Sequence, residues 1–193
     1  MLKVFRTVIV YSLRNVGKSE LVRYWLRRGD VNAVIIYARL LRDRDLSRRL
    51  GISCLGANAV SELARDVVKE VLESIEGMGV LSLVASITER ILNTLRSLRK
   101  PLYVFIDEYH LLPRYKSTLA PSRLEEALED LEALAALLAK DPRYEGARLI
   151  LTVSEGFIAT RLARQKLLGY SAAWLLVEPM DLNHFAELYR EYR

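Results

Sequence analysis

The sequence is poor in the residues that cross-link small proteins or bind zinc. Its 193 residues include one cysteine, Cys54, and two histidines, His110 and His184. A single cysteine excludes a disulfide within the chain and a cysteine-rich zinc cluster. Because disulfide-rich domains belong to oxidising compartments, a cytoplasmic location is the simplest expectation.

Long apolar runs are also missing, although 51% of the residues are hydrophobic. No run approaches the roughly 20 residues that a membrane-spanning helix needs. The N-terminus lacks the pattern of a signal peptide, and repeats and low-complexity linkers are absent. We therefore expect one domain over residues 1–193 with a sizeable core and no membrane association.

Acidic residues are fewer than basic ones, which gives a net charge of +5. The densest basic cluster lies in residues 39–49, and its arginines are Arg39, Arg42, Arg44, Arg48 and Arg49. Such a segment is a candidate surface for nucleic acid, an acidic partner or phosphate groups. A solvated arginine-rich surface is the favoured interpretation, because no aromatic side chains that could stack on bases are interleaved with the cluster.

Apolar runs alternate with helical patterns along the chain. The runs that predict strands are Val4–Tyr11, Ala33–Ala38, Leu102–Asp107, Leu149–Val153 and Ala173–Val177. Helical patterns between them predict an α/β fold, a five-stranded parallel sheet with helices on both faces. Apolar spacing also predicts a helical insert over about residues 57–99, and helices from Pro121 to Leu138, over 157–168 and over 183–192.

The first strand leads into Ser12-Leu13-Arg14-Asn15-Val16-Gly17-Lys18-Ser19. This segment fits the phosphate-loop pattern Gly-x-x-x-x-Gly-Lys-Ser/Thr except at Ser12, and a helical pattern follows it. The candidate nucleotide-binding residues are Ser12, Arg14, Asn15, Val16, Gly17, Lys18, Ser19 and Glu20. The strand–loop–helix order predicts a phosphate site, although a Gly-Lys-Ser that merely begins a helix is the alternative.

Each residue type in this loop has a physical role. Backbone amides and the helix N-terminus form a concave anion site, and Gly17 lets the backbone approach the phosphate oxygens. Lys18 would bring an ammonium to the terminal phosphates, and Ser19 a hydroxyl to magnesium. Ser12 allows fewer backbone angles than glycine at the turn out of the strand, so weakened or reshaped binding is expected.

A second motif closes the third apolar run with Asp107 and Glu108. Ligands of open α/β sheets bind at the carboxyl ends of the strands. Asp107 is therefore predicted to hold magnesium, and Glu108 to orient or deprotonate an attacking water. His110 is a weaker candidate, since a lone histidine after a strand is more often a surface or packing residue.

A third run ends in Thr152-Val153-Ser154-Glu155-Gly156. Ser154 or Thr152 could contact the terminal phosphate or the water. A hydroxyl that closes a strand or caps a helix is an equally good interpretation, and Glu155-Gly156 fits ordinary turn chemistry.

Together these segments resemble the archaeal P-loop ATPases of the AAA+/STAND group. The segments that carry the resemblance are residues 14–25, the Phe105-Ile106-Asp107-Glu108 run, and the run from Leu151 to Gly156. The resemblance implies a P-loop NTPase three-layer sandwich with strand order 5-1-4-3-2, and ATP and Mg²⁺ as ligands. It implies phosphate and magnesium roles for Lys18, Ser19 and Asp107, a catalytic base in Glu108 and a sensor in Ser154.

The sequence departs from that family pattern in three places. Ser12-Leu13 stands where family loops usually have Gly-Pro, and the first strand begins almost at Met1. The chain ends at Arg193, where family members continue into a helical lid and often a winged-helix domain. We therefore expect the nucleotide-binding core alone, without those C-terminal domains.

Two functions from different classes follow. The leading hypothesis is an ATP-binding, magnesium-dependent ATPase core, for which Arg161 and Arg164 are arginine-finger candidates by position only. The alternative is a degenerate, non-hydrolysing P-loop protein that acts as a binding or scaffolding module, with nucleic acid, a protein client or a second copy as partner. A GTPase is disfavoured because no Asn-Lys-x-Asp motif is present, and no acceptor site of a kinase can be identified.

Overall fold

The computed structural model describes residues 6–29, 31–38, 52–55, 85–86, 88–90, 93, 101–109, 121–154, 172–179 and 181. The elements, in chain order, are β1 (Thr7–Tyr11), α1 (Lys18–Arg28), β2 (Asn32–Tyr37), β3 (Ile52–Leu55), β4 (Leu102–Asp107), α5 (Pro121–Lys140), the 3₁₀ helix η4 (Pro142–Tyr144), β5 (Ala147–Val153) and β6 (Ala172–Leu176). Residues 85–86, 88–90 and 93 are helical and lie in the expected insert. The rest of the insert, apart from these residues, and the helices expected over 157–168 and 183–192 lie outside the described residues.

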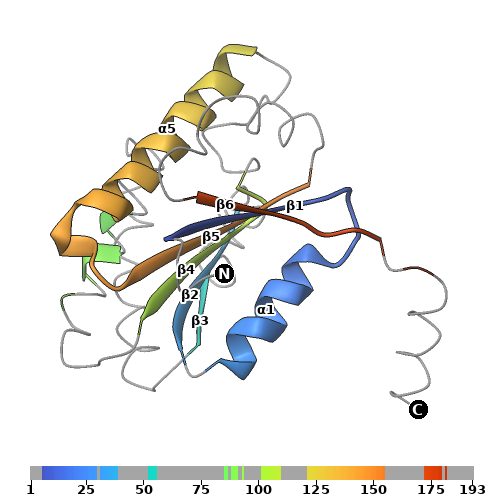
Figure 1. Cartoon of the computed structure of the whole chain (residues 1–193), viewed down its shortest axis with the longest axis horizontal. Coiled ribbons are helices and arrows are strands. Elements are labelled where there is room, and N and C mark those ends of the chain that lie inside the picture. Colours follow the sequence, from blue (N-terminus) through green and yellow to red (C-terminus); the bar gives the residue numbers. More distant parts are fainter. Residues whose placement is uncertain are drawn as a thin grey trace.

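The strands form one sheet in the order β3-β2-β4-β5-β1-β6 (Figure 1). The neighbouring pairs among β2, β4, β5, β1 and β6 are all parallel. These are the five strands that the apolar runs predicted, and their order is the predicted 5-1-4-3-2. The fourth of them, β5, lies between β1 and β4 and so separates the phosphate loop from the Asp107 strand.

The sixth strand, β3, was not predicted from the sequence. It pairs antiparallel to β2 at the edge of the sheet, with Ala33 opposite Leu55 and Ile36 opposite Ile52. Four residues are too few to establish an alternating pattern, and an antiparallel strand on an otherwise parallel sheet is a common edge arrangement. The parallel core is therefore as expected, and β3 extends it on the β2 side.

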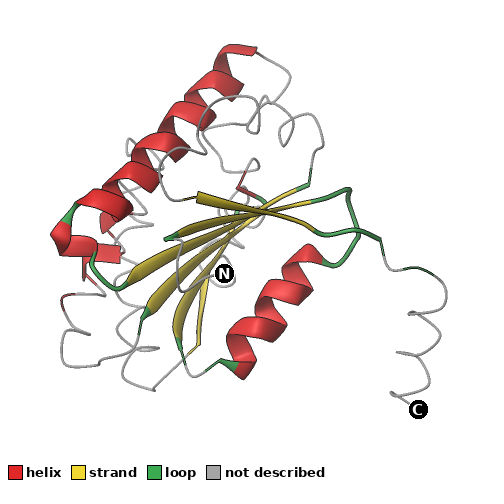
Figure 2. Ribbon diagram, viewed as in Figure 1, coloured by secondary structure: helices red, strands yellow, loops and turns green. Residues whose placement is uncertain are grey.

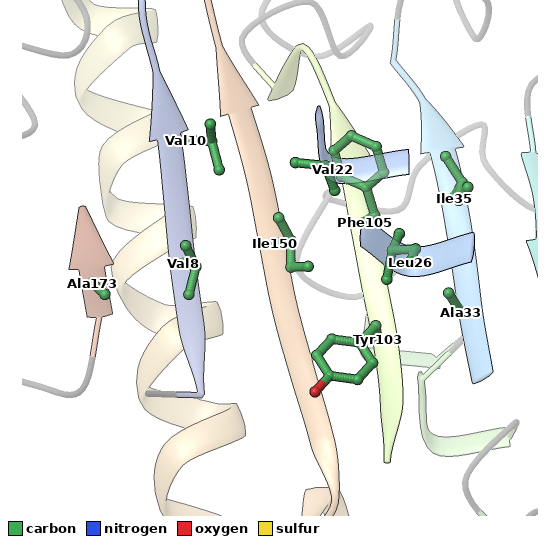
Figure 3. Packing of buried hydrophobic residues seen from close by; sticks show 10 residues of the cluster. All are labelled: Val8, Val10, Val22, Leu26, Ala33, Ile35, Tyr103, Phe105, Ile150 and Ala173. Carbon is green, nitrogen blue, oxygen red and sulfur yellow. The ribbon is translucent and has the colours of Figure 1, made fainter. Parts of the chain in front are cut away.

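The two described long helices lie on opposite faces of this sheet, which makes three layers (Figure 2). Every residue of β4 is buried, as expected for a central strand covered on both sides. Alternate side chains face α1, and Figure 3 shows Val22 and Leu26 of α1 lying over β4 beside Phe105. On the other face α5 packs against β5 and buries Leu134 and Leu138.

Local chemistry defines both ends of α1. Gly17 precedes it in a left-handed conformation with φ 86°, and Glu20 lies in the first turn. Arg27 and Arg28 lie in the last turn, where positive charge favours the helix dipole. The helix ends where the Gly29 N–H donates to the carbonyl of Trp25 at 3.0 Å. This orientation directs the N-terminus of α1, and its exposed amide groups, toward the loop after β1.

Within the described part of the chain, no helix combines the length and apolar character needed to cross a bilayer.

Candidate functional site

Three separate segments converge at the carboxyl edge of the sheet. The phosphate loop follows β1, Asp107 ends β4, and Ser154 follows β5. The parallel register aligns these ends, because Tyr11 pairs with Val153 and Tyr37 with Asp107. The sequence motifs, which lie up to about 140 positions apart, therefore meet at one edge, as the strand order requires.

The phosphate loop, residues 12–17, has an open backbone. Asn15 and Gly17 both adopt positive φ, at 62° and 86°, and Leu13 is 65% exposed. A Cβ added to Gly17 would meet no atom within 4 Å. Glycine is therefore favoured here by the left-handed backbone and not by crowding from protein atoms.

Lys18 is a buried residue of the loop motif, with only 5% of its surface exposed. Its Nζ donates to the carbonyl oxygen of Leu13 at 2.7 Å, so the side chain reaches back across its own loop. Burial lowers the pKa of the Lys18 ammonium from its ordinary 10.5, and the negative charges of Glu108 and Asp107 act in the opposite direction. The ammonium and both carboxylates thus share one electrostatic environment.

Asp107 is the most densely hydrogen-bonded residue of the site. Its Oδ1 accepts hydrogen bonds from Ser19 Oγ at 2.5 Å and Thr152 Oγ1 at 2.7 Å. Its Oδ2 accepts one from Arg23 Nη2 at 3.0 Å. Both oxygens are therefore engaged, by groups from α1 and β5.

Glu108 follows directly and has a different setting. Its backbone is left-handed, with φ 55°, a conformation that costs a non-glycine residue roughly 1–3 kcal/mol. The Glu108 N–H donates to Thr152 Oγ1 at 2.8 Å, and Glu108 Oε1 accepts a hydrogen bond from Ser154 Oγ at 3.1 Å. The strained turn and these two bonds point the second carboxylate toward the end of β5.

Ser12, the residue that departs from the phosphate-loop pattern, is buried. Its N–H donates to the Val153 carbonyl at 3.4 Å, a long bond that joins the loop to the end of β5. Its Oγ is buried without a hydrogen-bond partner among the described residues. The serine therefore fits the turn but adds an unsatisfied hydroxyl.

The other predicted nucleotide-binding residues lie on the loop and on the first turn of α1. Arg14 and Asn15 are exposed and Val16 is partly buried, while Glu20 on the first turn of α1 forms an ion pair with Arg23. The structure brings Lys18, Ser19, Asp107, Glu108 and Ser154 together in one site. The candidates that lie outside the described residues are His110, Glu155, Gly156, Arg161, Arg164 and the arginines of residues 39–49.

Sequence reasoning missed Arg23. Ser19 and Arg23 are four positions apart on α1 and so lie on the same helix face. Both donate to Asp107, one to each carboxylate oxygen. The helical spacing from Ser19 was the signal that could have identified it.

The pair formed by Ser19 Oγ and Asp107 Oδ1 fits a magnesium ion by its donor chemistry. Both are hard oxygen ligands of the kind that Mg²⁺ prefers, and Mg²⁺ is usually bound by one or two protein groups together with substrate phosphates. In the described ranges, no three histidine, cysteine, aspartate or glutamate side chains form a metal site by themselves. The site therefore fits magnesium that arrives with phosphate ligands.

No protein-family model matches the sequence, and no curated protein matches it. The fold is similar to that of the ORC2 protein of Aeropyrum pernix in its ADPNP–ADP complexes, with a TM-score of 0.57 and 14% identity over 97% of this chain and 46% of that one. The ORC1 protein of Aeropyrum pernix in complex with DNA gives a TM-score of 0.51 and 17% identity over 96% of this chain and 44% of that one. This chain thus spans less than half the length of these proteins, and the likeness establishes the fold.

Proposed function

We propose that this chain is a nucleotide-binding P-loop domain of the AAA+ type that binds ATP together with Mg²⁺. The observation that carries the proposal is the convergence of Lys18, Ser19, Asp107 and Glu108 in one hydrogen-bonded site. Four residue types with distinct uses in phosphoryl chemistry come from two distant segments of the chain and meet at the edge where such sheets bind ligands. A helix that merely begins with Gly-Lys-Ser requires no such convergence.

The geometry supports a proposed binding role for each of these residues. The amides of the phosphate loop and the N-terminus of α1 would contact the phosphates, and Lys18 would leave the Leu13 carbonyl to pair with them. Ser19 and Asp107 would hold the magnesium. When bound, this ion supplies positive charge that neutralises the phosphate oxygens.

Hydrolysis is the proposed activity, with Glu108 as the base. Its carboxylate would accept the proton of an attacking water, and Ser154, which donates to Glu108 Oε1, would orient that carboxylate. The shared fold with the ORC proteins supports this proposal, because ORC2 is described in complexes with ADPNP and ADP. Membership of the STAND group remains part of the proposal.

Nucleic acid is the first partner proposed beyond nucleotide. ORC1 is described in complex with DNA, and the arginine-rich segment 39–49 is the candidate nucleic-acid surface here. A protein client or a second copy of the chain is the alternative partner. Binding to DNA that weakens steeply with salt would support the nucleic-acid proposal, and no binding at low salt would remove it.

The test of the proposed function is a titration with a fluorescent ATP analogue, with and without magnesium. Wild type should bind saturably, and Lys18→Ala should lose roughly 100-fold or more in affinity, because the buried ammonium that pairs with the phosphates is gone. Glu108→Gln should keep binding and lose phosphate release. Absence of saturable binding by wild type at millimolar nucleotide would refute the proposal.

A non-hydrolysing binding module is the second candidate. The unsatisfied Ser12 hydroxyl favours it, as does the engagement of both Asp107 oxygens by protein donors. Single-turnover phosphate release separates the two functions. Release that Glu108→Gln abolishes supports the ATPase, and nucleotide binding without any release supports the module.

A further inference from the structure

Arg23 lies next to Asp107, the proposed magnesium ligand. Its Nη2 donates to Asp107 Oδ2 at 3.0 Å, and its Nη1 to Glu20 Oε1. The guanidinium carbon lies 5.1 Å from the centre of the Tyr37 ring at the end of β2, in cation–π geometry. Arg23 is therefore held by two carboxylates and one aromatic face.

The ion pair between Arg23 and Asp107 is largely shielded from water. The two side chains are 20% and 11% exposed, so their attraction is much less screened than that of a surface pair. The rest of the Asp107 carboxylate is saturated as well, since Oδ1 accepts from both Ser19 and Thr152. A cation that approaches Asp107 meets a carboxylate whose charge is already compensated.

Both terminal nitrogens of the Arg23 guanidinium have carboxylate partners, whereas its third nitrogen differs. Its Nε is buried and has no hydrogen-bond partner among the described residues. Tyr37, on which it rests, forms a hydrogen bond through its hydroxyl with Ser53 Oγ of β3, at 3.3 Å. The Tyr37 side chain is thus held by a hydrogen bond of its own. Its cation–π contact would keep Arg23 near the site if the bond from Arg23 to Asp107 broke.

We propose that Arg23 is a positioning residue that acts as a resident cation on Asp107 and prevents free divalent metal from binding before nucleotide. This inference rests on the proposed function, since it concerns the same magnesium site. A free dication must displace Arg23 and the Ser19 hydroxyl with only water as its other ligands. A metal ion already bound to ATP brings phosphate oxygens, and those phosphates offer Arg23 and Lys18 new anionic partners.

The consequence is an ordered site in which metal enters with nucleotide. Without Arg23, less positive charge would offset the Asp107 carboxylate beside Ser19 Oγ, and the nucleotide-free site would attract divalent ions more strongly. Charges close together in a partly buried site interact strongly, because the effective dielectric constant there is well below that of water. Even after partial compensation by water, removal of the guanidinium should raise metal affinity at least roughly 10-fold.

The test measures Mn²⁺ binding to the nucleotide-free full chain by electron paramagnetic resonance. Arg23→Met removes the charge and keeps the length of the side chain, whereas Arg23→Lys keeps the charge. Arg23→Met should bind Mn²⁺ at least about 10-fold more tightly than wild type, and Arg23→Lys should remain near wild type. The double variant Arg23→Met/Asp107→Asn should lose the gain.

Arg143→Met is the matched control, because Arg143 also forms an arginine–aspartate pair, with Asp141, but far from this site in the fold. It should leave Mn²⁺ binding unchanged. Should Arg23→Met fail to fold, Arg23→Gln provides the same charge change with a polar side chain. No gain in a folded Arg23 variant, or a gain that survives Asp107→Asn, would overturn the inference.

The ATP titration keeps the two proposals distinguishable. If wild type binds ATP with magnesium and Arg23→Met shows no Mn²⁺ gain, the role of Arg23 is refuted while the proposed function stands. If wild type binds no ATP, the proposed function is refuted, and the ordering of metal and nucleotide is refuted with it.

Discussion

The phosphate loop, residues 12–17, and the corner formed by Asp107 and Glu108 lie at the carboxyl ends of β1 and β4, the two strands that flank β5, and are built in opposite ways. Most of the loop is exposed, including Leu13 and Gly17, although Ser12 at its start is buried. The corner is held by hydrogen bonds from α1 and β5 that reach both carboxylates. Both contain left-handed residues, and in the corner side-chain hydrogen bonds fix both carboxylates before a ligand is present.

This difference indicates a division of labour within one site. A loop that binds phosphate through backbone amides needs amide donors that are free. If protein acceptors already held those amides, they would compete with the phosphate oxygens. A carboxylate that holds metal or moves a proton needs a fixed position, which neighbouring donors supply. Thr152 is central to the corner, because its hydroxyl donates to Asp107 and accepts from the Glu108 amide.

The largest expected effect tests Thr152 against a matched threonine. Thr152→Val removes a buried hydroxyl with two partners and should lower the free energy of unfolding by about 1–3 kcal/mol. Thr7→Val replaces a buried hydroxyl that has no partner among the described residues, so it should be neutral or stabilising. Urea denaturation measures both, and equal losses would mean that the corner does not depend on its hydrogen bonds.

The next effect separates backbone strain from ligand contact. Gly17 and Gly146 both have positive φ, at 86° and 90°, and open space around them. Alanine at either position should cost about 1–2 kcal/mol of stability. Only Gly17→Ala should also weaken ATP binding, roughly 10-fold or more, because it lies in the phosphate loop. If Gly146→Ala weakened binding as much, the loss would reflect stability and not contact.

A smaller effect concerns the left-handed backbone of Glu108. Glu108→Gly and Glu108→Ala both remove the carboxylate and its hydrogen bond to Ser154. Glycine adopts φ 55° without the strain that alanine retains, so Glu108→Gly should be the more stable variant by about 1 kcal/mol. Thermal unfolding compares them, and a more stable alanine variant would show that the corner relaxes once the carboxylate is gone.

The smallest effect is a pH dependence from Lys18. Because burial lowers the pKa of its ammonium below the ordinary 10.5, the native protein releases this proton at a lower pH than the unfolded chain does. Between those two pKa values the unfolded chain binds more protons, so stability rises with pH. Wild type should gain stability over Lys18→Met as the pH increases toward 10.5. Parallel curves for the two proteins would contradict this prediction.

Much of the fold could be predicted because its signals are local. The five parallel strands are long apolar runs, and the covalent order of strand and helix restricts how they assemble. The loop is equally local, since Gly17 and Lys18 are adjacent in the sequence. The strand β3 could not be predicted, because four residues carry little pattern and their pairing with β2 depends on the exposed edge of the finished sheet.

The sequence by itself determined the parallel core, the phosphate loop and the presence of two carboxylates at the end of a buried strand. These features arise from neighbouring residues, through hydrophobic periodicity and backbone preference. Only the tertiary structure decided that Thr152 would join Asp107 to Glu108, and that Arg23 would occupy the second oxygen of Asp107. Such contacts join residues 44 to 84 positions apart, and they exist only once the order of strands has brought β4, β5 and α1 side by side.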